Sequence, residues 1–121
     1  MKTDGLVPEH WLCERLGESV AVLNIPASLS RDRVFDVDVS LQVKVPEDEM
    51  AQAWHGLSLE VDGKSQWTRR IASNCPGQTD GLDYHCKIVL KCGRGMRIRA
   101  MASVQASVVV RLVVEATQAL A

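Results

Sequence analysis

Four basic side chains close together in the second half of the chain have the types and spacing best suited to binding chemistry. They are Lys91, Arg94, Arg97 and Arg99. The glycines on either side of Arg94 predict a hairpin turn, which would place Lys91 opposite Arg97 and Val89 opposite Arg99. Ammonium and guanidinium groups gathered on one face bind phosphate and carboxylate groups. The sequence therefore predicts a face for a small anionic ligand or an acidic partner.

The same basic face also has a structural interpretation. Like charges directly opposite each other on neighbouring strands cost up to about 1 kcal/mol per pair, so another group must offset them. Asp36 and Asp38 lie on the polar face of another predicted strand and are suited to pair with these bases. The sequence leaves both interpretations open.

The formal net charge of −1 conceals two halves of opposite sign. Residues 1–62 carry twelve acids and five bases, whereas residues 63–121 carry nine bases and three acids. Halves of opposite sign most often pair with each other within a fold. The pI of the whole chain is about 6.3 and aromatic side chains make up 4% of the residues, which argues against nucleic acid as a partner.

The sulfur and imidazole groups match no metal site. The four cysteines are Cys13, Cys75, Cys86 and Cys92. No Cys-x-x-Cys occurs, and neither His10-x-x-Cys13 nor His85-Cys86 has a usual zinc spacing. The acids between positions 32 and 38 lack the loop of a calcium-binding EF-hand. We therefore expect reduced thiols, no metal and no cofactor.

The motifs of the common enzyme families are missing from the sequence. It contains no Gly-x-Ser-x-Gly, no Walker loop and no His-Glu-x-x-His. His85 and Cys86 could supply a base and a nucleophile, but adjacent residues of a strand face opposite sides. We assign no catalytic residues and favour a non-catalytic protein, with an enzyme as the third interpretation.

Alternating apolar and polar residues predict β-strands over most of the chain. The clearest alternation runs from Phe35 to Val45 and predicts one long strand with a single buried face. Around the turn at Asp62-Gly63, burial of one face requires Leu59 opposite Trp67, which predicts a three-residue loop, 62–64. Further strands are expected over Val20–Ile25 and from Tyr84 to Cys92, with an exposed loop over Ser73–Gly81 before the latter.

The last apolar run, from Met96 to Val114, is too long for one strand. Apolar residues hold the even positions throughout, yet a continuous strand would span about 66 Å. We expect a bend or division among the small residues 102–107. After these, Val109 and Val113 make the second face apolar too, which predicts a strand covered on both sides.

Two short helices are also predicted. Pro8–Leu16 has a proline suited to a first helical turn, a narrow apolar stripe and a following glycine. Pro46 followed by three acids predicts one or two helical turns that end near Gly56.

The composition indicates one globular domain over residues 1–121. The chain is 46% hydrophobic and 24% charged, and it has no apolar stretch long enough for a membrane helix. The first residues do not form a signal peptide, so we expect a soluble protein in the cytoplasm. The predicted fold is all-β: an antiparallel β-sandwich of six or seven strands with one or two short helical segments, or a partly closed barrel as second choice.

These patterns favour a module that binds another protein or a second copy of itself as a homo-oligomer. A strand apolar on both faces must lie inside a sheet or be covered by a partner. The alternative is a domain that binds a small ligand or anion through Lys91, Arg94, Arg97 and Arg99.

Overall fold

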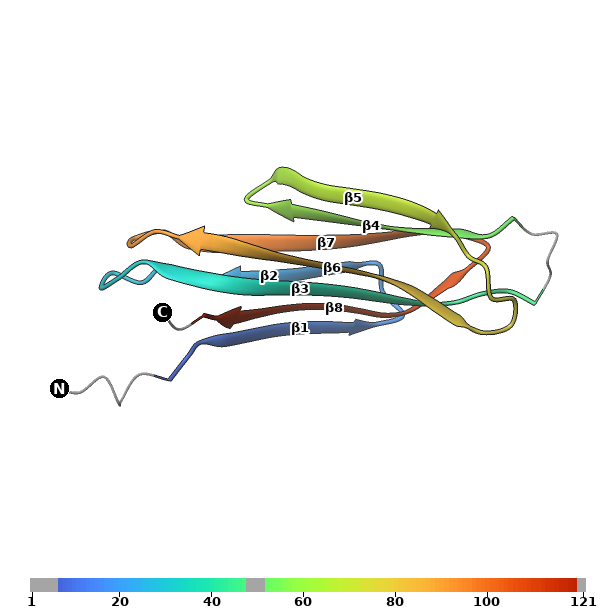
Figure 1. The fold of residues 1–121 in the computed structure, drawn as a ribbon, viewed down its shortest axis with the longest axis horizontal. Coiled ribbons are helices and arrows are strands. Elements are labelled where there is room, and N and C mark those ends of the chain that lie inside the picture. Colours follow the sequence, from blue (N-terminus) through green and yellow to red (C-terminus); the bar gives the residue numbers. More distant parts are fainter. Residues whose placement is uncertain (1–6, 48–51, 120–121) are drawn as a thin grey trace.

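The computed structural model describes residues 7–47 and 52–119, which form two antiparallel four-stranded sheets packed face to face (Figure 1). The strands are β1 (His10–Leu16), β2 (Val20–Ile25), β3 (Arg33–Lys44), β4 (Trp54–Val61), β5 (Lys64–Ala72), β6 (Thr79–Leu90), β7 (Met96–Gln105) and β8 (Val108–Gln118). The first sheet has the order β1-β8-β3-β6, and the second has the order β2-β7-β4-β5. The predicted antiparallel β-sandwich is confirmed, with eight strands in the described ranges.

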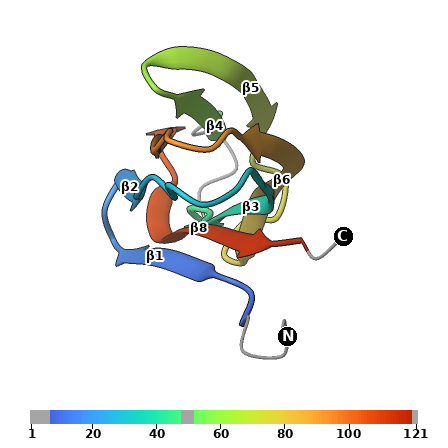
Figure 2. The same ribbon diagram turned by 90° about the vertical axis from the view of Figure 1, so that its left-hand side faces the viewer.

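The strands pair as they would in one long hairpin that has been wrapped into a sandwich. Strand β4 pairs with β5, β3 with β6, β2 with β7, and β1 with β8. The chain turns back tightly between β4 and β5, and each other pair of consecutive strands is divided between the two sheets. This is the arrangement of an eight-stranded jelly roll. The end-on view in Figure 2 places β5 and β1 at opposite extremes of the molecule.

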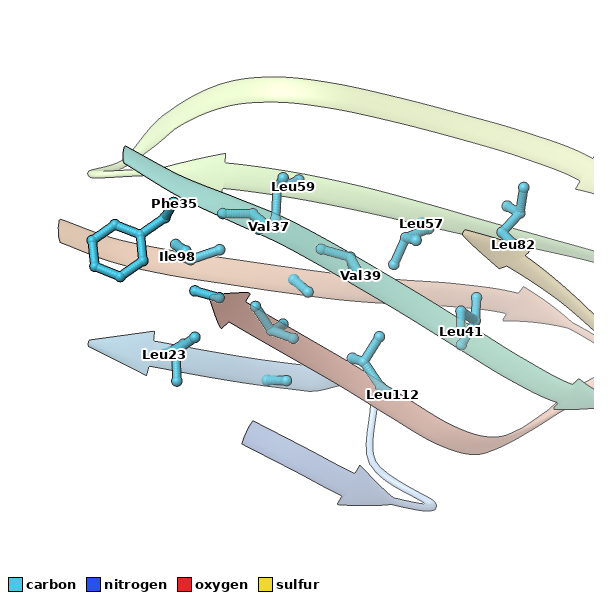
Figure 3. Packing of buried hydrophobic residues seen from close by; sticks show 14 of the residues in the cluster. Leu23, Phe35, Val37, Val39, Leu41, Leu57, Leu59, Leu82, Ile98 and Leu112 are labelled. Carbon is cyan, nitrogen blue, oxygen red and sulfur yellow. The ribbon is translucent and has the colours of Figure 1, made fainter. Parts of the chain in front are cut away.

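The core lies between the two sheets. Every apolar residue of the predicted alternation in β3 faces inward and is at most 2% exposed, up to Val45 just beyond the strand. Leu57 and Leu59 from β4, Ile98 from β7 and Leu112 from β8 meet this row from the other strands (Figure 3). Each such side chain contributes about 1.5–3 kcal/mol through its burial.

The β4–β5 hairpin has the predicted register but a different loop. Leu59 lies opposite Trp67, as burial requires, yet Val61 already pairs with Lys64. The connection therefore has two residues, both with positive φ, which is the geometry of a type I′ turn. A bulge at Gln66 supplies the extra residue that restores the register.

The C-terminal run divides where the small residues lie, as predicted. Strand β7 ends at Gln105 and β8 begins at Val108, and Ala106 between them has a φ of 63°. This corner carries the chain from the second sheet to the first. There β8 lies between β1 and β3, the interior position expected for a strand that is apolar on both faces.

A bulge in β8 changes which valines are buried. The register against β3 shifts between Gln42 and Val43, which leaves Val110 as the extra residue. Val109 is consequently 8% exposed, whereas Val108 is 63% exposed and Val110 is 40% exposed. The prediction that this strand is covered on both sides is wrong for Val108 and Val110, because the inserted residue reverses the alternation.

Both helix predictions are wrong for the residues that the structure describes. Pro8–Leu16 was expected to be helical, but His10–Leu16 forms β1 and half-buries Trp11 and Cys13 beside β8. Trp54, expected in a helical turn that ends near Gly56, instead begins β4, and residues 48–51 lie outside the described ranges. Pairing with a long neighbouring strand outweighs the local helix signals. No helix long and apolar enough to cross a membrane occurs in the described part of the chain.

Candidate functional site

The structure separates the basic residues that were predicted to share one face. Strand β6 pairs with β3 and β7 pairs with β2 and β4, so the segment between β6 and β7 crosses from one sheet to the other. Lys91 precedes this crossing, and its Nζ lies 3.7 Å from Asp32 Oδ2. Arg97 and Arg99 lie beyond it, in the second sheet. The predicted hairpin, with Lys91 opposite Arg97 and Val89 opposite Arg99, is therefore wrong.

Acids lie beside the basic residues of β7. Arg99 is directly opposite Glu60, and the backbone N–H of Arg97 donates to Asp62 Oδ1 at 2.9 Å. Both arginines border a small hollow of about 130 Å³ together with Glu60. Arg94 is exposed in the connection that precedes β7. The four basic residues are thus divided between two sheets, with Lys91 paired to Asp32 and Arg99 opposite Glu60.

The acids predicted to neutralise the basic cluster pair with other bases. Asp36 lies 3.0 Å from Lys87 Nζ, and Asp38 lies 2.7 Å from His85 Nδ1, because β3 and β6 are neighbours. The acidic half of the chain thus does pair with the basic half, through Asp36 with Lys87, Asp32 with Lys91 and Glu14 with Arg111. Sequence reasoning could not select these partners without the strand order.

Two adjoining hollows lie on the outer face of the first sheet, next to polar side chains. One of about 500 Å³ is lined by Ser40, Leu41, Gln42, Thr79, Asp80, Gly81 and Arg111. The other, of about 330 Å³, is lined by Asp38, Val39, Ser40, Asp83, Tyr84 and His85. They meet at Ser40, and we call the two together the outer-face groove.

Gly81 creates the hollow at one end of the groove. It lies opposite Gln42 in the register between β3 and β6. A Cβ atom at this position would lie 2.6 Å from the carbonyl oxygen of Leu41, so a side chain would force the two strands apart. The strands approach closely because residue 81 is glycine, and Gln42 is left without a side chain opposite it.

The groove presents both donors and acceptors of hydrogen bonds. The amide of Gln42, the hydroxyl of Ser40 and the carboxylate of Asp83 all face outward on neighbouring strands. Tyr84 lines the groove, and its ring is stacked on the ring of Trp67 with the two centroids 4.4 Å apart. This stack joins β6 to β5 across the open side of the sandwich and holds that end of the groove in place.

His55 supports the groove from beneath and was missed by the sequence analysis. Its side chain is completely buried, its Nε2 donates to the carbonyl oxygen of Gly81 at 3.3 Å, and its Nδ1 lies 2.7 Å from Ser73 Oγ. Ser73 in turn lies 2.9 Å from Ser107 Oγ. No substrate reaches a histidine in this position, so the pair with Ser73 serves structure. The signal available in the sequence was the alternation of His55 with Leu57, which indicates that His55 faces inward.

Tyr84 and Cys86 make the stability of the fold depend on pH in the alkaline range. Burial is the main cause that raises the pKa of both groups, and the neighbouring Cys86 raises the pKa of Tyr84 further. Each group therefore holds its proton more tightly in the folded chain than in the unfolded chain. The ordinary pKa values are 9.0 for Cys86 and 10.0 for Tyr84. Above them the unfolded state binds fewer protons than the folded state, so stability falls as pH rises.

We expect the free energy of unfolding to be insensitive to these two groups below pH 9 and to decline above it. Urea denaturation between pH 8 and pH 11 measures this slope. The double variant Tyr84→Phe with Cys86→Ala should flatten it, whereas Cys92→Ser, at an exposed thiol, should not. Equal slopes for the double variant and the unaltered chain would assign the decline to other groups.

Within the described ranges, the thiols and metal-binding residues form no cluster. All four cysteines are free. Across residues 7–47 and 52–119, no group of three or more His, Cys, Asp or Glu side chains is arranged to hold a metal ion.

Comparisons with known proteins support the fold. No family model and no curated protein matches the sequence. The chain is similar to part of dimeric latent PorU from Porphyromonas gingivalis, with 13% identity and a TM-score of 0.54 over 93% of this chain and 13% of that one. A family 35 carbohydrate binding module from an environmental isolate is 13% identical with a TM-score of 0.46, over 88% of this chain and 73% of that one. The insecticidal delta-endotoxin Cry8Ea1 from Bacillus thuringiensis is 15% identical with a TM-score of 0.46, over 96% of this chain and 20% of that one. At these identities, the similarity to PorU is evidence for the β-sandwich and for nothing finer.

Proposed function

We propose that this chain is a non-catalytic binding module whose outer-face groove takes a neutral, polyhydroxylated ligand of the carbohydrate class. The observation that carries the proposal is the groove itself, which is hollowed at Gly81 and lined by polar side chains on β3, β6 and β8. The proposal depends on this geometry and not on the similarity to carbohydrate-binding modules.

The chemistry of the lining suits vicinal hydroxyl groups. A sugar hydroxyl both donates and accepts, so it requires acceptors such as Asp83 next to donors such as the amide of Gln42. Ser40 lies between them, where the two hollows meet, and its hydroxyl can do either. A ligand that extends along the groove could contact all three side chains at once.

The charges of the groove favour a neutral ligand over an anion. His85 is hydrogen-bonded to Asp38, and Arg111 is paired with Glu14, so both side chains already have acidic partners. Asp83 makes no ion pair with any residue in the described ranges. An anionic ligand would therefore meet a carboxylate whose charge is not offset.

Binding to a panel of soluble polysaccharides tests the proposal. We expect affinity electrophoresis to show retardation by at least one neutral polymer among β-glucan, xylan and mannan, but not by polygalacturonate. Gln42→Ala and Asp83→Ala should each weaken that binding about tenfold, the effect of losing about 1.4 kcal/mol of hydrogen bonding.

Gln66→Ala is the matched control, because Gln66 is an exposed glutamine on the other sheet. It should leave binding unchanged. The proposal is overturned if no neutral polymer binds, or if Gln66→Ala weakens binding as much as Gln42→Ala. Binding of polygalacturonate that disappears in Arg97→Ala with Arg99→Ala would instead support the anion-binding prediction.

A further inference from the structure

Strand β1 is an edge strand with two exposed leucines. It ends the first sheet at the side remote from β5 (Figure 2). Leu12 is 55% exposed and Leu16 is 69% exposed, and no proline interrupts the strand. An edge of this kind offers a row of backbone hydrogen-bonding groups to another strand.

The pairing with β8 shows which backbone groups point outward. The N–H of Gln118 donates to the carbonyl of Glu9 at 2.8 Å, and the N–H of Gly17 donates to the carbonyl of Val110 at 3.0 Å. Alternate residues of a strand direct their backbone groups to the same side, so the odd-numbered residues between these two bond to β8. The residues that direct their N–H and C=O groups to the edge with which no other described strand pairs are His10, Leu12, Glu14 and Leu16.

We propose that two copies of this chain pair antiparallel through β1, with the two-fold axis at Cys13, to form one continuous eight-stranded sheet. In this register Leu12 of each copy faces Glu14 of the other, and His10 faces Leu16. All four outward-pointing residues then exchange both backbone hydrogen bonds with a partner. The interaction goes beyond the proposed groove, which lies over β3, β6 and β8.

Other registers are less favourable. A shift by two residues in one direction places Glu14 opposite Glu14 of the second copy, and like charges directly opposite each other are unfavourable. The opposite shift brings Pro8 against Leu16, and proline has no N–H to donate. A shift by one residue sets outward-pointing groups against residues that already bond to β8. Only the register centred on Cys13 uses the whole strand without these costs.

The inward-facing side chains of β1 are compatible with the same register. Trp11 lies opposite Arg15 of the second copy, which allows a cation–π contact on each side of the axis. By contrast, edge strand β5 carries three basic residues and no acid, and its bulge at Gln66 interrupts regular pairing. Self-pairing is therefore better supported at β1 than at β5.

A proline in β1 tests the pairing without disturbing β8. Leu12 directs its N–H to the free edge, so Leu12→Pro removes no bond within the sheet but blocks an incoming strand. Sedimentation velocity over a concentration series should show a dimer for the unaltered chain and for the control Leu12→Ala. For Leu12→Pro the dimer dissociation constant should rise at least a hundredfold, with the melting temperature measured alongside to confirm folding.

The native thiol gives a second test that does not require the proline variant to fold. At the two-fold axis the Cα atoms of Cys13 and its copy form a non-hydrogen-bonded pair about 4.5 Å apart, within the range of a disulfide. Copper-phenanthroline, which accepts the two electrons released by the thiols, should cross-link the unaltered dimer. Cys13→Ser should abolish the cross-link, and Cys92→Ser should retain it.

Three results would overturn the proposal. They are a strict monomer at every concentration, a folded Leu12→Pro variant that dimerises like the unaltered chain, and a cross-link that persists in Cys13→Ser. A dimer that loses its cross-link in Cys92→Ser would place the interface at another surface. None of these results bears on polysaccharide binding, so the two proposals fail independently.

Discussion

Arg33→Ala is expected to lower the free energy of unfolding by about 3–5 kcal/mol, the usual cost of breaking a buried ion pair. Arg33 is 3% exposed, and its Nη1 donates to Glu9 Oε1 at 2.6 Å. Its Nη2 donates to the carbonyl oxygen of Pro26 at 2.7 Å, and its guanidinium lies over the ring of Phe35. Alanine would leave the carbonyl of Pro26 without its donor and the Glu9 carboxylate with Trp11 Nε1 as its remaining donor, and it would open a cavity beside the ring.

Urea denaturation of Arg33→Ala should be compared with that of Arg15→Ala. Arg15 also pairs with a glutamate, at 3.6 Å from Glu18, but its side chain is half exposed. Exposed ion pairs contribute about 0–1 kcal/mol, so Arg15→Ala should hardly change the free energy of unfolding. A loss below 1 kcal/mol for Arg33→Ala would mean that the pair with Glu9 does not hold the N-terminal strand in place.

His55→Ala should destabilise the fold by about 3 kcal/mol or more. The variant leaves Ser73 and the carbonyl of Gly81 without their common partner, at about 1–3 kcal/mol for each buried group, and also opens a cavity. Ser107, linked through Ser73, loses part of its network too. Because this network holds the start of β6, the variant should also weaken binding in the outer-face groove.

The control for His55→Ala is His85→Ala, which removes an exposed histidine from the same sandwich. His85 is paired with Asp38 at the surface, so its loss should cost less than about 1 kcal/mol. Thermal unfolding of the two variants side by side distinguishes them. Equal melting temperatures would show that the buried network does not contribute to stability.

Local alternation was sufficient to predict the faces of the longest strands. In β3 the residues from Phe35 to Val45 are buried at every second position, as their pattern indicates. The corner near Ala106 followed from strand length alone. These features depend on the period of the strand and on how far a strand can extend, both of which a sequence carries directly.

The candidate site could not be predicted because it depends on strand order. Gly93-Arg94-Gly95 has the composition of a hairpin turn, yet β6 finds its partner in β3, whose paired residues lie 35 to 57 positions earlier along the chain. Nothing local distinguishes a hairpin from a connection between sheets. The groove joins Gln42 to Gly81 through that same long-range pairing, so its residues carry no common signal in the sequence.

The nested pairing of the strands has a consequence for how the chain folds. The turn at Asp62-Gly63 closes the shortest loop, and the pairs β3–β6, β2–β7 and β1–β8 enclose successively longer ones. Closing a long loop costs less entropy once the pair inside it has formed, so we expect assembly to proceed outward from this turn. During synthesis, β1 therefore stays without its neighbour in the first sheet until β8 has left the ribosome.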